Sequence, residues 1–467
     1  MKMTKYKLGE LVEVTRGASL SGQFYAEEGK LIRLTLGNFN MNGGGFKENT
    51  SKTDLYFTGT VRDEFILNKG DIITPLTEQS LGLLGTTARI PESGKYIQSQ
   101  DVALVRCKEG LLDPNFCYYL ISSSIVRQQL SAAAQQTKIR HTSPEKIKDC
   151  TVWVPDFYTQ KNIGRILTDI DNKIAINRRI NDNLEAMAKQ LYDYWFVQFD
   201  FPNEEGKPYK SSGGAMVWNE KLKREIPQGW SGVSLKDLAL TSRNAITPVE
   251  NEVYQHFSIP SFDACGSYSL DNGSDIKSDK FVLQKGQLLV SKLNPWFNRV
   301  VWVPKGTNMI GSTEFVVLNP NNESESGYIY SVIKSPKFIA YCSQAATGTS
   351  HSQRRVSPDV LMAFKVVYEQ GVVQKYGCLI EKIQKQQAEL LSEIAMLTKQ
   401  RDELLPLLMN GQATVNYHLS AKAYPLPIAY KKAMPIEANQ IISSTFIQKL
   451  DSHIPSPRLQ TSQIRCS

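Results

Sequence analysis

The chain has 467 residues, of which 41% are hydrophobic and 21% charged, and its formal net charge is +8. This length exceeds what one hydrophobic core serves, so two or three domains are expected, and the weak positive charge is compatible with a polyanionic ligand without demonstrating one. The chain shows no secretory signal, no apolar run of the ~20 residues needed to span a membrane, and no C-x2-C pair among its seven cysteines. We therefore expect no membrane partner, no zinc site and no disulfide framework, and free thiols in a reducing cytosol.

Residues 1–155 are predicted to form a mixed α/β domain. Short β-rich runs, among them KLIRLTL, GDIIT, DVALVR and CTVWVP, are bounded by Gly, Asn and Pro, as is typical of strands separated by turns. One helix-like stretch, FCYYLISSSIVRQQLSAAA, lies inside this domain.

A long amphipathic helix is predicted over residues 156–199. Asp156 follows Pro155 and can cap the helix by accepting from free backbone N–H groups. Asn177 and Asn181 fall in the register of an apolar stripe on this helix. The stripe recurs at three- and four-residue steps and consists of Leu167, Ile170, Ile174, Leu184, Leu191 and Trp195.

The rest of the chain repeats this organisation. Residues 200–228 have the composition of a polar linker with Gly, Ser and Pro. Residues 229–370 are predicted to form a second mixed domain, and residues 371–410 a second long helix that stops at Asn410-Gly411. Residues 411–467 show no periodicity and suggest a loosely ordered tail.

The two halves are copies of one passage, about 215 residues apart. FILNKGDIITP in the first copy corresponds to FVLQKGQLLVS in the second, and TKIRHTSPEKI corresponds to TSHSQRRVSPDVL. The separation drifts by only three residues between three anchor pairs: Gly70 with Gly286, Pro144 with Pro358, and Leu191 with Leu404. Two related modules on one chain indicate one task done at two places, such as binding a bipartite stretch of nucleic acid. The first copy carries an excess of 11 residues, since the span from Leu8 to Phe65 is 57 and that from Leu235 to Phe281 is 46, and Gly43 to Gly45 mark a loop within it.

The two long helices are predicted to pack on each other. The stripe on the second helix matches that on the first, and it consists of Ile380, Ile383, Gln387, Leu390, Ile394, Leu397, Leu404 and Leu408. Each stripe covers about four heptads, which is longer than one small domain can cover. The alternative is that each stripe packs only on its own domain.

Sequence patterns for catalysis are weak. Asn294-Pro295-Trp296-Phe297 resembles the Asn-Pro-Pro-aromatic turn with which adenine methyltransferases grip a flipped base, but its second Pro is replaced and no Gly-rich cofactor turn precedes it. The five histidines are isolated, and no metal-binding or general acid/base pattern is present. We expect no catalytic residue and no metal ligand in this chain.

Two loops in each copy are candidates for contacts with bases or phosphates. One precedes the long helix, and the other follows the GDII or GQLL strand. Both are dense in groups that hydrogen-bond base edges, such as Arg to guanine and Gln to adenine, although a single basic loop is more often a solvated surface. The candidates are Thr77, Gln79, Lys138, Arg140 and His141 in the first copy, and Lys292, Asn294, Trp296, Arg299, Ser350, Gln353, Arg354 and Arg355 in the second.

Six sequence phrases between residue 4 and about residue 411 are distinctive: YKLGELVEVTRG, NKGDII, TSPEKIKDCTVWVP, the central NEEGKPYKSSGG and REIPQGW, and the ending ELLPLLMNGQ. On these phrases, the chain resembles the DNA-specificity subunits of type I restriction-modification enzymes. The resemblance implies two tandem target-recognition domains that read the halves of a split, asymmetric sequence in double-stranded DNA, with the helices as an antiparallel coiled-coil spacer.

The resemblance also implies partners in the cytoplasm of a bacterium or archaeon. Methyltransferase subunits would dock on this chain, and a nuclease-translocase subunit would join them. No cofactor would be bound by this chain itself, since S-adenosylmethionine, ATP and Mg would belong to the partner subunits. A stand-alone two-domain DNA-binding regulator and a fused restriction-methylation enzyme are the alternatives, and the second would need cofactor motifs that this chain lacks.

Overall fold

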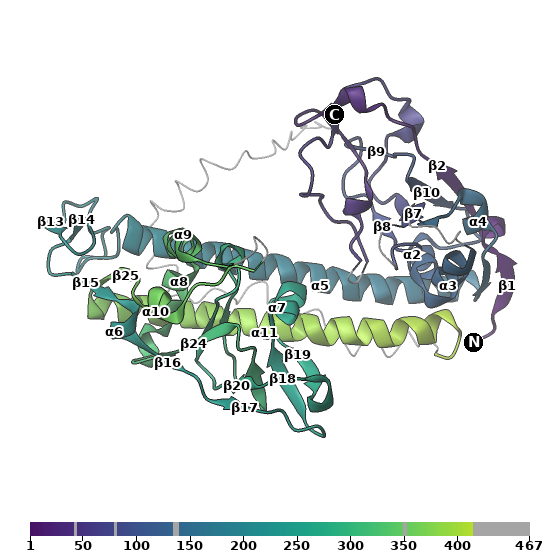
Figure 1. Cartoon of the computed structure of the whole chain (residues 1–467). Coiled ribbons are helices and arrows are strands. Elements are labelled where there is room, and N and C mark those ends of the chain that lie inside the picture. The colour runs from purple at the N-terminus through teal and green to yellow at the C-terminus, as the bar shows by residue number, and fades with distance from the viewer. Residues whose placement is uncertain (42–43, 79–81, 134–139, 349–352, 414–467) are drawn as a thin grey trace, which may run out of the picture. The chain divides into compact units, whose positions relative to one another are not determined.

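The computed structural model describes residues 1–41, 44–78, 82–133, 140–348 and 353–413. The chain divides into two compact units (Figure 1). The first contains Met1–Leu184, Pro260–Ser269 and the described residues from Lys385 onward, and the second contains Glu185–Ile259 and Leu270–Gln384.

In the first unit, β1 (Thr4–Lys7) pairs antiparallel with β12 (Thr151–Val154). One sheet has the strand order β2-β10-β6-β8, and another has the order β3-β5-β4-β9, in which β4 and β9 are parallel. The strands are β2 (Val12–Arg16), β3 (Tyr25–Ala26), β4 (Leu31–Arg33), β5 (Tyr56–Phe57), β6 (Ile72–Pro75), β7 (Thr77–Glu78), β8 (Ala88–Arg89), β9 (Tyr96–Ile97), β10 (Val102–Cys107) and β11 (Arg140–His141). The helices are α1 (Leu8–Leu11), α2 (Pro114–Ser122), α3 (Ser124–Ala133) and α4 (Pro144–Lys148), with the 3-10 turns η1 (Gly22–Phe24), η2 (Leu36–Asn38) and η3 (Asp63–Phe65).

The second copy has the same plan. Its β15–β25 pair corresponds to β1–β12, and its sheet β16-β24-β21-β22 corresponds to β2-β10-β6-β8. A further sheet, β17-β20-β23-β18-β19, again contains one parallel pair, β18 with β23. The strands are β13 (Met216–Asn219), β14 (Arg224–Pro227), β15 (Ser231–Ser234), β16 (Ala239–Ser242), β17 (Ala245–Ile246), β18 (Val253–Phe257), β19 (Ser269–Asn272), β20 (Lys280–Val282), β21 (Leu288–Ser291), β22 (Val300–Trp302), β23 (Met309–Gly311), β24 (Phe315–Pro320) and β25 (Lys365–Tyr368). The helices are α6 (Leu235–Leu238), α7 (Ile259–Cys265), α8 (Ser326–Lys334), α9 (Pro336–Ala345) and α10 (Pro358–Met362), with η5 (Gly273–Asp275), η6 (Pro295–Phe297) and η7 (Glu323–Glu325).

The helix-like stretch of the first copy is two helices, where one was expected. Ser123 interrupts it between α2 and α3 with the extended angles φ −66 and ψ 154. The second copy breaks at the same place, where Ser335 caps α9 by accepting from the N–H of Phe338 and Pro336 occupies the first helical position. A serine that can accept from the next turn favours a new helix start over continuation.

Both predicted long helices are present. α5 (Phe157–Tyr192) continues into the π-helical turn η4 (Asp193–Val197), and α11 spans Gln370–Met409. As expected, the carboxylate of Asp156 accepts from the N–H of Thr159, with 3.0 Å between the two atoms. The stop at Asn410-Gly411 is also confirmed, since Gly411 has the positive φ of 76° that ends many helices.

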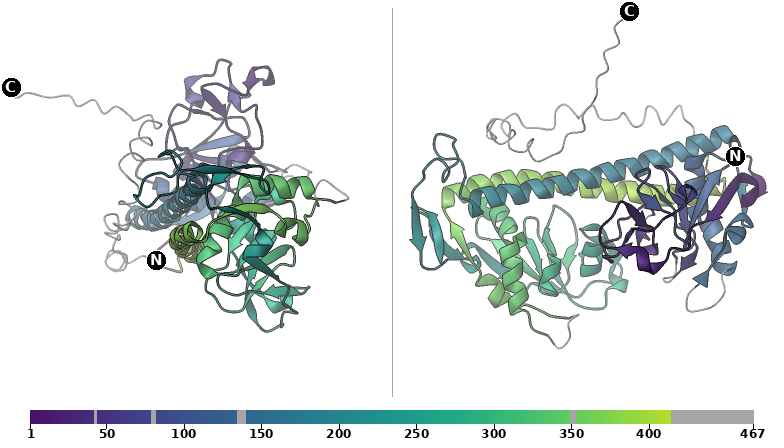
Figure 2. Two further views of the ribbon diagram at one scale, coloured as in Figure 1. Left: turned by 90° about the vertical axis from the view of Figure 1, so that its left-hand side faces the viewer. Right: turned by 90° about the horizontal axis from the view of Figure 1, so that it is seen from above.

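The helices pack on each other, side by side, in both units (Figures 1 and 2). In the first unit, Asn177 donates to Glu393 over 2.8 Å, and Gln387 donates to the carbonyl of Asn181 over 3.3 Å. In the second, Tyr376 donates to the carbonyl of Ala188 over 3.4 Å. The residue numbers of the partners on α11 fall as the residue numbers on α5 rise, so the two helices are antiparallel. The asparagines on the stripe thus hydrogen-bond across the helix pair.

Each helix also contributes to the core of each unit. The first core takes Ile163 and Leu167 from α5 and Leu408 from α11. The second core takes Phe196, which follows α5, and Tyr376 from α11. The alternative in which each stripe packs only on its own domain is therefore wrong.

The segment expected as a polar linker contains folded structure. β13 and β14 form an antiparallel hairpin between Met216 and Pro227. Phe201 and Ile226, which flank and enter this hairpin, are buried in the second core. Ring stacking of Phe201 on Tyr209, with 4.8 Å between centroids, holds the intervening residues 202–208 in a closed loop.

The expectation of free thiols holds for the part of the chain that the structure describes. The free cysteines there are Cys107, Cys117, Cys150, Cys265, Cys342 and Cys378, while Cys466 lies outside it. Burial raises the pKa of the Cys342 thiol to about 12, so that thiol stays protonated at neutral pH.

Candidate nucleic-acid interface

The two candidate loops of each copy lie side by side. In the first copy, β7 pairs antiparallel with β11, so that Glu78 lies opposite Arg140 and Thr77 opposite His141. In the second copy, Leu293 forms a bridge with Arg355. Residues far apart in sequence thus form one surface in each copy, at matching places in the fold.

In the first copy, the buried side chain of Glu78 holds the residues of this surface in place. Its side chain is buried, and Oε1 accepts from the backbone N–H groups of Gly82 and Leu83 over 2.6 and 2.8 Å. Its Oε2 lies 3.8 Å from Nη1 of Arg140, which also donates to the hydroxyl of Ser131 over 3.1 Å. Glu78 therefore holds the backbone of Gly82 and Leu83 as well as the basic strand β11.

The predicted contact residues of the first copy differ in access. Thr77 is buried, Arg140 is half-buried and His141 is exposed. Among these three, His141 and the guanidinium of Arg140 can reach a ligand. Gln79 and Lys138, together with Ser350 of the second copy, lie outside the described residues.

In the second copy, Asn294 takes the place of Glu78. It adopts the left-handed conformation, with φ 49° and ψ 66°, which asparagine tolerates better than most residues. Its backbone N–H donates to the carbonyl of Arg354 over 2.8 Å, and its Oδ1 accepts from the N–H of Arg354 over 3.0 Å. The side chain is buried and ties two loops together, which is a different role from gripping a flipped base.

Trp296 and Phe297 project from the turn η6 that Asn294 begins. The exposed fraction is 40% for Trp296 and 56% for Phe297, and the two ring centroids are 6.0 Å apart. The guanidinium of Arg299 lies 4.5 Å from the centroid of the Phe297 ring, although Arg299 itself is buried. A large apolar tip is therefore supported by a cation below it.

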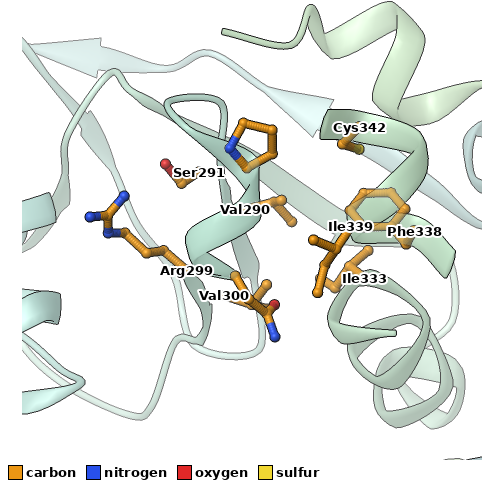
Figure 3. A pocket seen from close by; sticks show the side chains of 10 residues that line it. Val290, Ser291, Arg299, Val300, Ile333, Phe338, Ile339 and Cys342 are labelled. Carbon is orange, nitrogen blue, oxygen red and sulfur yellow. The ribbon is translucent and has the colours of Figure 1, made fainter. Parts of the chain in front are cut away.

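The underside of η6 is packed against α9. Pro295 is buried there, and the space left among Val290, Ile339 and Cys342 is about 10 Å³, close to the volume that one water needs. In Figure 3 the side chain of Arg299 points away from the apolar group formed by Ile333, Phe338, Ile339 and Cys342. The turn thus has a filled interior and an exposed aromatic surface.

The basic residues of the second loop are not equivalent. Arg355 donates to both carboxylate oxygens of Glu314, from Nε to Oε2 over 3.0 Å and from Nη2 to Oε1 over 3.0 Å. Hydrogen bonding to Glu314 raises the pKa of the Arg355 guanidinium. Gln353 is exposed, while Arg354 and Lys292 are half-buried. Arg355 is therefore engaged by the protein itself.

Comparisons of the sequence with known proteins find similar proteins of one kind. Residues 1–186 match the family described as "Type I restriction modification DNA specificity domain". The chain is 22% identical over 325 residues to the type I restriction enzyme MjaIX specificity subunit of Methanocaldococcus jannaschii, covering 66% of this chain and 71% of that protein. It is also 27% identical over 107 residues to the HindI specificity subunit of Haemophilus influenzae, covering 22% and 23% of the two chains. By these matches, the chain is similar to specificity subunits of type I restriction-modification systems.

A solved structure is similar to this chain in fold. A crystal structure of the S subunit of a type I restriction-modification system from M. genitalium covers 88% of this chain, and 96% of that chain is matched. The TM-score is 0.56 at 17% sequence identity, so this likeness concerns the fold. The mixed α/β fold with long helices, expected from the sequence, is confirmed. Among the described residues of this chain, no helix is both long and apolar enough to cross a membrane.

Sequence reasoning missed one polar surface of the first copy. A cavity of about 580 Å³ opens in the first copy beside β4 and η2. Lys47, Lys52 and Gln100 line it together with the buried Arg33, which stacks 3.8 Å from the centroid of the Tyr25 ring. The sequence feature that could have pointed to this cavity is the 11-residue excess of the first copy. Much of the cavity lining comes from residues 33–52, which lie in the longer span between Leu8 and Phe65.

Proposed function

We propose that this chain reads a bipartite, asymmetric DNA sequence, with one copy of the repeat on each half-site. The observation that supports this is the recurrence of one loop pair on one scaffold with different side chains. The first copy presents Arg140 and His141 over Glu78, whereas the second presents Trp296, Gln353 and Arg354 over Asn294. Two surfaces of different hydrogen-bonding character suit two different base sequences.

We further propose that the paired helices act as the spacer between the half-sites. α5 has 36 residues and α11 has 40. A helix of this size is ~54–60 Å long at ~1.5 Å per residue, which is comparable with one and a half turns of B-DNA at ~34–36 Å per turn. Hydrogen bonds between the helices in both units support a stiff element.

The partners are part of the same proposal. Methyltransferase subunits dock on this chain, and a nuclease-translocase subunit joins the complex in the cytoplasm. S-adenosylmethionine, ATP and Mg are held by those partners, so this chain supplies DNA recognition. It is the specificity component of its system, and the reacting groups belong to the other subunits.

Methylome sequencing of the host with and without this gene tests the proposal. We expect deletion to remove one split adenine-methylation motif. Purified chain alone is expected neither to methylate nor to cleave DNA, and adding the methyltransferase partner restores methylation of that motif. Methyl transfer by the lone chain, abolished by Asn294→Ala, would contradict the proposal, as would an unchanged methylome together with altered transcription, which a stand-alone regulator predicts.

A further inference from the structure

The tip formed by Trp296 and Phe297 is the feature of the second copy that hydrogen-bonding readout leaves unexplained. Large aromatic side chains are usually buried, yet these two stand on a three-residue turn with exposed fractions of 40% and 56%. The matching passage of the first copy, TPLTEQSLGLLGTT, contains no aromatic residue. The tip is therefore a property of the second copy and is not required by the shared scaffold.

The turn that carries the tip is held rigidly. Asn294 and Asn298, at its two ends, both adopt the left-handed conformation, with φ 49° and 50°. The N–H of Phe297 donates to the carbonyl of Asn294 over 3.1 Å, and the N–H of Asn298 donates to that of Pro295 over 3.0 Å. With Pro295 packed beneath and Asn294 bonded to Arg354, the rings have a fixed base. A rigid tip loses little conformational freedom when it inserts into a ligand.

The charges around the tip indicate a polyanion. Lys292 and Arg354 flank it, Arg299 lies beneath Phe297, and the nearby carboxylate of Glu314 is neutralised by Arg355. Apolar side chains surrounded by cations are the combination with which proteins insert between stacked base pairs while holding the neighbouring phosphates. An apolar protein partner would gain nothing from the positive surround.

We propose that Trp296 and Phe297 form an aromatic wedge that inserts at one base step of the second half-site and unstacks it. This inference rests on the proposed function, since it takes double-stranded DNA as the ligand of this copy. The free energy of binding by the second copy then includes the cost of unstacking one base-pair step. Because this cost depends on the DNA sequence, it adds selectivity that hydrogen bonds alone do not give. The first copy, without a wedge, leaves its half-site stacked at this place.

The test uses the full chain assembled with its methyltransferase partner and a duplex carrying the methylated motif. 2-Aminopurine, whose fluorescence rises on unstacking, is placed in turn at each position of both half-sites except the methylated adenines, which the partner extrudes during its own reaction. We expect one position in the second half-site to brighten on binding. Trp296→Ala and Phe297→Ala should lose this signal and weaken binding roughly 5- to 150-fold, the range for loss of one stacked aromatic.

Trp218→Ala is the matched control, because Trp218 is 58% exposed on β13 of the same unit. It should leave both the signal and the affinity unchanged, and Trp296→Phe should retain most of the signal because it keeps a flat ring. The wedge is contradicted if no position of the second half-site brightens although the duplex is bound, or if the signal survives both alanine substitutions. It is also contradicted if those substitutions block co-purification with the methyltransferase and spare the signal, since the tip is then a protein contact. Failure of the wild-type complex to prefer any bipartite duplex would instead overturn the proposed function itself.

Discussion

The two copies share a scaffold but attach the long helices to it by different polar contacts. In the first copy, Tyr119 of α2 donates to Asp171 over 2.6 Å, and Arg401 of α11 lies 3.0 Å from the other carboxylate oxygen of Asp171. In the second, Tyr376 of α11 donates to Ser331, the counterpart of Tyr119, over 2.8 Å. Apolar packing and strand order are kept, whereas polar contacts at matching places are rebuilt. The scaffold therefore sets where the recognition loops lie, and side-chain chemistry at those places is free to diverge.

The same contrast holds at the loops. Glu78 and Asn294 occupy matching positions, and both fix the basic loop beside them. Glu78 does so with a carboxylate that pairs with Arg140, and Asn294 does so with an amide and a left-handed backbone. One structural requirement is thus met by two chemistries, which leaves a different set of side chains free for DNA in each copy.

The largest expected difference between the copies concerns their helix contacts. Asp171→Ala leaves Arg401, which is 9% exposed, without the carboxylate of Asp171, and removes the carboxylate to which the Tyr119 hydroxyl donates. We expect a loss of about 2–4 kcal/mol, less than for a fully buried pair because Asp402 remains bonded to Arg401. Tyr376→Phe removes only neutral hydrogen bonding, to Ser331 and to the carbonyl of Ala188, and should cost about 0.5–1.5 kcal/mol.

Hydrogen exchange measures each copy separately, through peptides from α2 and α8, because the two units need not unfold together. Asp402→Ala is the control, since that side chain is 59% exposed and should change stability by less than ~1 kcal/mol. Equal losses for Asp171→Ala and Tyr376→Phe would show that the ionic contact is not special to the first copy.

A second comparison uses a glycine that both copies share. Gly164 and Gly377 lie at matching places in the long helices, and each allows close approach to the helix packed against it. A Cβ at Gly164 would lie 2.6 Å from the backbone N of Phe116, and one at Gly377 would lie 1.9 Å from the carbonyl oxygen of Ser324. Each alanine substitution should therefore lower the free energy of unfolding of its unit by about 1–3 kcal/mol or more, and the loss should be larger for Gly377→Ala.

Gly371→Ala is the matched control in the same helix. Its added Cβ would meet nothing closer than 3.4 Å, so alanine should stabilise the second unit by about 0.5–1 kcal/mol. Thermal unfolding of the three variants decides between these effects. Similar stability of Gly377→Ala and Gly371→Ala would mean that η7 can move away from α11 at little cost.

Much of this architecture could be predicted from the sequence, because it follows from local patterns. Asp156 marks the start of α5, Gly411 the end of α11, and the apolar stripe predicts that the helices pair. The break at Ser123 was missed because apolar periodicity continues across it. The hairpin within residues 200–228 was missed because its Gly, Ser and Pro content resembles that of a linker, while the rings that hold it lie outside the strands.

The candidate interface was predicted only as a set of loops. Strand pairing determines which loops meet. The side chain of Arg355 is bonded to Glu314, 41 residues away in sequence, and the backbone of Arg354 is bonded to Asn294, 60 residues away. No short-range pattern carries those pairings. Arg354 and Arg355 are equivalent in the sequence, and only their contacts in the folded structure distinguish them.

That distinction gives a prediction for the second loop. Arg355→Ala should lower stability slightly and leave the methylation motif unchanged, because Arg355 is bonded to Glu314. Arg354→Ala or Gln353→Ala should relax one base position of the second half-site by about 1–3 kcal/mol, or reduce the salt slope of binding by about one unit if the contact is to phosphate. Methylation-motif sequencing and binding at several salt concentrations separate these results, and a null result for both Arg354→Ala and Gln353→Ala would remove this loop from the interface.

The smallest expected effect is a pH dependence confined to the helix pair of the first unit. Glu393 pairs with Lys173 and accepts from Asn177 over 2.8 Å, and hydrogen bonding from Lys173 lowers the pKa of its carboxyl group. A lowered folded-state pKa contributes stability that is present above the ordinary value and is lost as the pH falls through the folded value. Glu393→Gln should therefore cost less than ~1 kcal/mol at neutral pH, and its cost should shrink as the pH falls below the ordinary pKa of a glutamate. An equal cost at neutral and at low pH would mean that the ion pair does not contribute.

The central claim is that each copy reads its own half-site, and an exchange of one copy tests it most directly. Residues 229–370 are replaced by the corresponding segment of another specificity subunit, leaving both long helices unchanged, and the methylated motif is determined by sequencing in the host. We expect one half of the motif to become that of the donor subunit, while the other half and the gap between them stay as in the original. A change in both halves, or in neither, would contradict independent reading by the two copies.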